Sequence, residues 1–173
     1  MIPELTNEGV LPLGRFSTSI EDVEARFVPA DNERRQELWK QWKHLTRLVH
    51  AVVGVLPAVW LGGSFLSSKT LPNDIDTVYI LKRDDMLRLK EDQAKVFNLI
   101  QTRQLDIGVD RVEPFFLFVE EVQGSGISGN YGPATGYLML RGYWDQLWSR
   151  SRADVAQSYP SHGYLEVIID GYQ

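Results

Sequence analysis

Apolar residues along this chain recur with two periods, one typical of helices and the other typical of strands. Between Asn32 and about Val55 they fall on one side of a long helix, at Leu38, Trp42, Leu45, Val49, Val52 and Val53. Helical spacing also predicts helices over about 18–27, 84–103 and 137–150. Short apolar runs predict strands over 58–62, 75–81, about 111–121 and 164–169. Helices thus alternate with strands, which predicts an α/β (α+β) fold in which a mixed sheet packs against helices.

The remaining segments contain no convincing linker between domains, so the pattern predicts one domain over 1–173. Glycine and proline breaks predict that residues 1–17 form an extended N-terminal arm. Residues 123–136 are rich in glycine and predict a flexible loop. Within it, Gly124, Gly126 and Gly129 match the dinucleotide-binding spacing, but Gly132, Pro133 and Gly136 follow where that motif needs a helix. We therefore do not interpret this segment as a dinucleotide site.

The densest candidate chemistry lies between the strands predicted at 58–62 and 75–81. Gly62-Gly63-Ser64 forms a tight turn after the first strand, and Asp74 and Asp76 flank an isoleucine at the start of the second. Residues two apart on a strand point the same way, with Cα atoms about 6.5–7 Å apart, so both carboxylates can converge on one divalent metal ion. Glycine lets a backbone approach a phosphate, and the serine hydroxyl and backbone N–H groups can hydrogen-bond it. A phosphate cradle next to a metal-binding acid pair is the minimum equipment for moving a nucleotide.

Two simpler interpretations of the acids exist. Asp74 and Asp76 can belong to the solvent face of a strand, although aspartate is depleted in strands. Asn73-Asp74 after Pro72 can also be ordinary turn chemistry, which leaves Asp76 exposed. The Gly-Gly-Ser turn, with nine residues between Ser64 and Asp74, favours the metal interpretation.

The Gly-Ser step, separated by nine residues from Asp-x-Asp, resembles the signature of the polymerase-beta-like nucleotidyltransferase superfamily. The resemblance implies a nucleotidyltransferase-like mixed sheet, Mg²⁺ or Mn²⁺ as cofactor and a nucleoside triphosphate as substrate. It also implies three metal-binding carboxylates, two on one strand and a third on a later strand. In this chain Asp74 and Asp76 match the first two.

For the third carboxylate, Gly108-Val109-Asp110 matches the family's pattern best, and Glu113 and Asp106 are alternatives. If the strand is regular, Glu113 and Asp110 lie on opposite faces, although Pro114 argues against a regular strand there. Lys69 lies between the turn and the acid pair and can reach a triphosphate, but a solvated loop lysine is the simpler interpretation.

Residues outside this core extend the resemblance to small uncharacterised nucleotidyltransferase-like proteins of bacteria and phages. They include the opening from Gly9 to Gly14, the segment from Asp22 to Phe27, Arg35, and a closing segment with Trp148, Arg152 and His162-Gly163. Arg141, Arg150 and Arg152 are candidates for binding phosphate or nucleic acid, although surface arginines are common. His44, His50 and His162 share no metal-ligand spacing, and the five tryptophans have the spacing of core residues.

Composition limits the kinds of partner and site that this chain can have. The chain has 43% apolar residues, a net charge of −5 and no cysteine. The negative charge argues against nonspecific DNA binding, and the absence of cysteine excludes a thiolate metal site and a cysteine nucleophile. The first residues lack the pattern of a signal peptide, and the longest apolar run is too short to span a membrane. The expectation is a cytoplasmic protein without a membrane partner.

The sequence therefore predicts a metal-dependent nucleotidyltransferase that modifies a hydroxyl of a protein, an RNA end or a small molecule. Its predicted site residues are Asp74, Asp76 and Asp110 for the metals, and Gly62, Gly63, Ser64 and Lys69 for the nucleotide. The alternatives are a catalytically inactive binding or regulatory module of the same fold, for instance in phage–host conflict, and a phosphohydrolase that uses the same acids.

Overall fold

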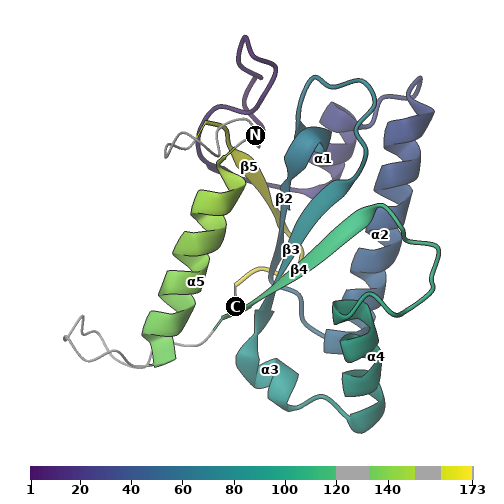
Figure 1. The fold of residues 1–173 in the computed structure, drawn as a ribbon, viewed down its shortest axis with the longest axis vertical. Helices are drawn as coiled ribbons and strands as arrows, with labels where there is room; N and C mark the ends of the chain where they lie inside the picture. The colour runs from purple at the N-terminus through teal and green to yellow at the C-terminus, as the bar shows by residue number, and fades with distance from the viewer. Residues whose placement is uncertain (120–132, 151–160, 173) are drawn as a thin grey trace.

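The computed structural model describes residues 1–119, 133–150 and 161–172. A five-stranded mixed sheet runs through its centre in the order β1-β5-β2-β3-β4 (Figure 1). The strands are β1 (Arg15–Thr18), β2 (Ala58–Gly62), β3 (Ile75–Lys82), β4 (Val112–Val119) and β5 (Tyr164–Ile168). β2 is antiparallel to both of its neighbours, whereas β1 pairs with β5 and β3 pairs with β4 in parallel. Every residue of β2 is buried, as expected for a central strand covered on both faces.

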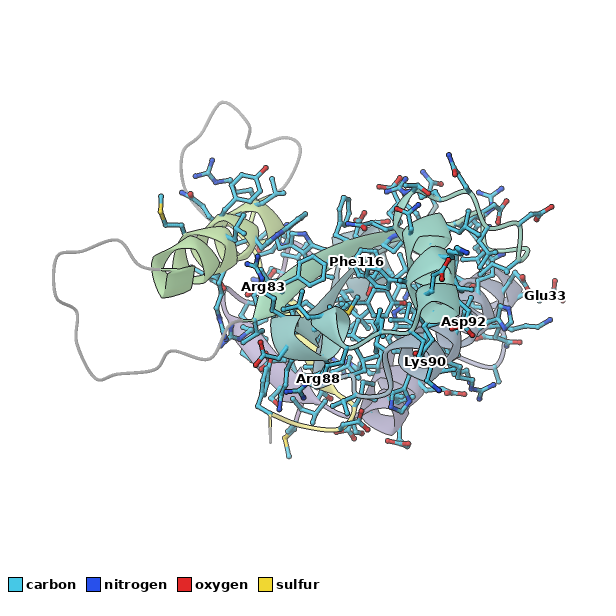
Figure 2. All side chains as sticks on the ribbon, turned by 90° about the horizontal axis from the view of Figure 1, so that it is seen from below. Glu33, Arg83, Arg88, Lys90, Asp92 and Phe116 are labelled. Carbon is cyan, nitrogen blue, oxygen red and sulfur yellow. The ribbon has the colours of Figure 1, made fainter. Side chains whose placement is uncertain are left out.

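Helices cover the two faces of the sheet unequally. Figure 1 places α2 and α4 on one face and α5 on the other, and Figure 2, seen from below, keeps α5 apart from α4 with the sheet between them. The helices are α1 (Ile20–Phe27), α2 (Glu33–Val53), α3 (Arg83–Leu87), α4 (Glu91–Gln101), α5 (Pro133–Trp148) and a single 3-10 turn, η1 (Gly63–Leu66). The described part of the chain is therefore a mixed α+β structure, which confirms the predicted fold class.

The larger core lies between the sheet and the helices α1, α2 and α4. Trp39 and Trp42 stack with ring centroids 4.3 Å apart, and Trp39 also stacks on Phe65. On the same side, Phe116 of β4 meets Phe97 of α4 edge to face (Figure 2). The smaller core lies under α5 and contains Ala58, Trp60, Val78, Ile80, Leu117, Trp148 and Tyr164. The spacing of the tryptophans was therefore correctly interpreted as core packing.

Buried hydrogen bonds tie β3 to α2. The Trp42 indole N–H donates to the Thr77 hydroxyl at 3.3 Å, and the hydroxyls of Thr46 and Tyr79 lie 3.0 Å apart. Burial raises the pKa of Tyr79 well above its ordinary value, so its hydroxyl stays protonated. These bonds fix the strand that carries the acid pair to the longest helix of the described chain.

Most predicted elements are confirmed. The long helix, the strands at 58–62, 75–82 and 112–119, and the closing strand lie where the periodicity placed them. β1 was not predicted, because its four residues form a strand only by pairing with β5, which lies almost 150 residues away, as Arg15 opposite Tyr164. No helix in the described residues is long and apolar enough to cross a membrane.

Two predicted boundaries were wrong. The single helix expected over 84–103 is divided into α3 and α4, because the Arg88 N–H closes the first on the Asp85 carbonyl and Gln93 accepts from the Lys90 N–H to begin the second. α5 begins at Pro133, four residues earlier than expected. Proline is favoured as a first helical residue, a signal that the glycine-rich context obscured. The rest of the loop predicted at 123–136, with the glycine motif, lies outside the described residues.

The junction between β1 and β5 provides a test of this packing. A Cβ on Gly163 would lie 2.2 Å from the Pro12 carbonyl oxygen and 2.6 Å from that of Gly14, so Gly163→Ala forces the backbone apart. We expect Gly163→Ala to lower the free energy of unfolding by about 1–3 kcal/mol, measured by urea denaturation. Gly142→Ala is the matched control: a Cβ there meets nothing within 4 Å, and alanine favours the helix. Equal stability of the two variants would contradict the close approach at Gly163.

Candidate functional site

The glycine turn sits against the carboxylate of Asp76. Gly62 ends β2 and pairs directly with Asp76 of β3. Gly63 opens η1 with φ of +74°, and a Cβ there would lie 2.2 Å from Asp76 Oδ2. The left-handed backbone therefore favours glycine at this position, and any other residue would also have to displace the Asp76 carboxylate. The predicted cradle and one of the predicted acids are direct neighbours in the structure.

Gly62 is also required, but for a different contact. A Cβ on Gly62 would lie 2.5 Å from the six-membered ring of Trp148. The last residue of α5 thus packs directly on the end of β2. Trp148 therefore covers Gly62, and Asp76 lies against Gly63, while Gly63 itself stays exposed.

The two aspartates stand at the start of β3. Asp76 lies in the strand, and alternation places it on the α5 side of the sheet with Val78 and Ile80. Asp74 comes one residue before the strand. Both residues are half-buried. Within the described residues, the Asp74 carboxylate makes no hydrogen bond or ion pair with the protein.

β4 brings Glu113 beside Asp76. The two residues are partners in the parallel β3–β4 register, so their side chains lie on the same face of the sheet. Arg103 has φ of +56°, a backbone conformation rare for a residue other than glycine. Its Nη1 lies 3.7 Å from Glu113 Oε1. Glu113 is therefore held in an ion pair at the edge of the sheet.

Asp110 lies before β4 and not in it. Its side chain is 72% exposed, and its nearest charged neighbour is Arg111, with Nε 3.8 Å from Oδ2. Because β4 begins at Val112, the argument from strand alternation between Asp110 and Glu113 does not apply. Pro114 is tolerated within the strand because β4 is an edge strand in the described sheet. Asp106, Asp110 and Glu113 line one cleft of about 410 Å³.

Carboxylate oxygens suit hard cations such as Mg²⁺, so the chemistry of this donor set fits the expected metal. Across the described ranges, however, no three acidic or histidine side chains converge closely enough to hold a metal ion. The structure brings Asp76 next to the turn and next to Glu113, whereas the assignment of Asp110 as a ligand stays a prediction.

A buried arginine shapes the loop that joins the turn to the acids. Arg35 of α2 is 5% exposed, and its guanidinium donates to the carbonyls of Phe65, Ser67 and Lys69 at 2.7–2.8 Å. It also donates to the carbonyl of Phe27 at 3.0 Å. Burial lowers the pKa of Arg35, yet the group stays charged because arginine titrates far above neutral pH.

Two neighbours of Arg35 complete this clamp. Asn32, the N-cap of α2, donates to the Thr70 carbonyl at 2.8 Å, and Arg34 donates to the carbonyls of Pro72 and Asn73. The start of α2 thus holds nearly the whole path from η1 to Asp74. No sequence pattern predicts this role, because any residue type can present a backbone carbonyl.

The other predicted residues play smaller parts in the described geometry. Ser64 is half-buried at the start of η1, and Lys69 is exposed. The backbone carbonyl of Lys69 belongs to the Arg35 clamp. Phosphate binding by its ammonium group stays a prediction. His50 pairs with Asp170 at 2.9 Å. Arg152 lies outside the described residues.

Comparison with known protein families assigns the chain to one of them. Residues 3–168 match the model of a family of unknown function, DUF6932. The chain belongs to the DUF6932 family. No curated protein and no solved structure matches it. For this DUF6932 chain, the geometry of its own residues is therefore the guide to function.

The contact between Gly63 and Asp76 can be measured with a double-mutant cycle. In an Asp76→Ala background, Gly63→Ala should cost about 1–2 kcal/mol, because only the left-handed backbone is strained. With Asp76 present, Gly63→Ala should cost at least about 1 kcal/mol more, because the new Cβ also clashes with the Asp76 carboxylate. Equal costs in both backgrounds would mean that the carboxylate does not lie against the turn.

The clamp makes a separate prediction. Arg35→Met leaves four carbonyls without their donor, so it should lower the free energy of unfolding by about 3 kcal/mol or more. Arg47→Met, on the exposed side of the same helix, is the control and should stay within about 0.5 kcal/mol of the parent. Hydrogen exchange should show faster exchange of the amides at 65–73 in Arg35→Met. Unchanged exchange in this loop would contradict the clamp.

Proposed function

We propose that this chain is a divalent-metal-dependent nucleotidyltransferase, which transfers a nucleotide from a nucleoside triphosphate to an acceptor hydroxyl. One observation carries the proposal: Gly62, Asp76 and Glu113 are direct neighbours across three adjacent strands, with the left-handed Gly63 turned against the Asp76 carboxylate. This arrangement supports a phosphate-binding turn and a pair of strands that present acids at one place.

The residues divide into two roles. The turn at Gly63-Ser64 would bind phosphate oxygens through backbone N–H groups and the serine hydroxyl. Asp74 and Asp76 would hold Mg²⁺ or Mn²⁺, which when bound lowers the pKa of the acceptor hydroxyl and neutralises the departing pyrophosphate. In the transfer, the acceptor oxygen forms a bond to the α-phosphorus while the bond to the pyrophosphate oxygen breaks.

For the third acid, the register favours Glu113 over Asp110. Glu113 already stands beside Asp76, whereas Asp110 precedes the strand and is mostly exposed. To act as a ligand, Glu113 must exchange its ion pair with Arg103 for the metal. The freed guanidinium would then lie close to the negatively charged substrate.

The same ion pair favours a second candidate function. If Arg103 keeps Glu113, the site keeps only two acids, Asp74 and Asp76. The protein would then act as a binding module without chemistry. The two candidates differ in whether labelled nucleotide is transferred.

Activity is tested by incubating the protein with Mg²⁺ or Mn²⁺ and each nucleoside triphosphate labelled at the α-phosphate or the γ-phosphate. The acceptors offered are the protein itself, an RNA with a free 3′ hydroxyl, and a cell extract separated into proteins and small molecules. Transfer of the α label supports the proposal and names the acceptor class. Release of the γ label as phosphate without α transfer indicates a phosphohydrolase, and the absence of both indicates the binding module.

The acids make a graded prediction for that assay. Asp74→Asn and Asp76→Asn should each reduce metal-dependent transfer by about 100-fold or more, because each removes a charged ligand. Glu113→Gln should reduce it to a similar extent, and Asp110→Asn should stay within a few-fold of the parent. Asp92→Asn, exposed on α4, is the control for removing one negative charge. The reverse order for Glu113 and Asp110 would return the third role to Asp110.

A further inference from the structure

A second polar cluster lies on the α5 side of the sheet, at the edge opposite β4. Arg15 on the edge strand β1 pairs with Tyr164 in register, and its Nε lies 3.7 Å from Glu166 Oε2. The Arg15 guanidinium lies over the Trp60 ring at 5.3 Å, and that of Arg141 on α5 lies 5.7 Å from the same ring. One buried indole therefore positions two guanidinium groups from two different elements.

Glu166 is the buried anchor of this cluster. It is 8% exposed, and its Oε1 accepts from the Trp60 indole N–H at 3.0 Å and from the Tyr172 hydroxyl at 2.6 Å. The other oxygen faces Arg15. Burial and the nearby Glu166 charge raise the pKa of Tyr172, so this hydroxyl remains a donor. Glu166 thus has partners within the fold and holds Arg15 in place.

Above this anchor, Arg15, Arg141, Gly142 and Asp145 line an open cleft of about 450 Å³. That volume suits a small ligand. Two arginines and one aspartate line the cleft, and the Glu166 carboxylate beneath it faces Arg15, so these four side chains carry no net charge together. Gly142 contributes no side chain, and the Asp145 carboxylate accepts a hydrogen bond from Tyr164. The cleft combines two guanidinium groups, open space and an acceptor that is already positioned.

We propose that this cleft between β1 and α5 binds a small phosphate ester, with the phosphate between Arg15 and Arg141. The N–H groups of a guanidinium lie in its plane, so a guanidinium whose face lies over an aromatic ring can still donate to two phosphate oxygens at once. Asp145, one helical turn after Arg141, offers an acceptor for a hydroxyl of the same molecule. The site shares no residue with the turn and the acid pair, so this proposal does not depend on the proposed nucleotidyltransferase activity.

The test uses the full chain, with ribose 5-phosphate and inorganic phosphate as probes, titrated in a calorimeter without divalent metal. We expect both to bind the parent at millimolar concentration or below, and ribose 5-phosphate more tightly than phosphate. Arg141→Gln should weaken both by about tenfold or more, because a charge-assisted pair of hydrogen bonds is lost. Arg15→Lys should also weaken them, since it keeps the charge but not the planar fork.

Gly142→Leu keeps both arginines and fills the cleft, so it should abolish binding while the protein remains folded. Gly142→Ala should retain most of the binding. Arg88→Gln, a substitution at a mostly exposed arginine of the loop after α3, controls for net charge, and Asp76→Asn controls for the acid pair; both should bind as the parent does. Binding to Arg141→Gln and Gly142→Leu within twofold of the parent, or the absence of binding to the parent, would overturn the proposal. Ribose 5-phosphate binding no tighter than phosphate would overturn the role of Asp145.

Discussion

The guanidinium of Arg35 is the interaction on which the candidate site depends. A buried charge is costly unless hydrogen bonds replace its water, and here backbone carbonyls provide those bonds. The carbonyls belong to Phe27, Phe65, Ser67 and Lys69, so one side chain joins α1, α2 and the loop after the glycine turn. Without it only Asn32 and Arg34, which donate to carbonyls at the far end of the loop, would remain of the clamp.

The clamp and the sheet act together. Arg35 of α2 holds the loop through its backbone carbonyls, while the antiparallel pairing of β2 with β3 sets Gly62 opposite Asp76. The hydrogen bonds from Trp42 and Thr46 to β3 hold the same strand to the same helix. The face toward α2 carries the larger core, whereas the face toward α5 carries a smaller core with polar groups at its edges. Acids stand at the β3–β4 edge of that face and arginines at the β1 edge.

This division of the sheet also explains why overall charge is a poor guide to the partners of this protein. The net charge of −5 describes the chain as a whole, whereas two guanidinium groups line the β1–α5 cleft. A small anionic ligand responds to the groups within a few ångströms, because salt screens more distant ones. An acidic protein can thus contain a cleft for a phosphate.

The sequence by itself determined the features that depend on near neighbours. Periodicity identified α2, β2, β3 and β5. Residue type identified the Gly-Gly-Ser turn and the acid pair, because glycine allows backbone conformations that other residues avoid and aspartate is depleted in strands. Tertiary structure decided the rest. Which acid stands beside Asp76 depends on the β3–β4 register, and the strand β1 exists only by pairing with β5. The Arg35 clamp and the cluster of Arg15, Trp60 and Glu166 join residues between 8 and 151 positions apart, and no local pattern encodes such pairs. Contacts of this kind are selected by packing and by the need to satisfy buried polar groups, which operate only once the chain has folded.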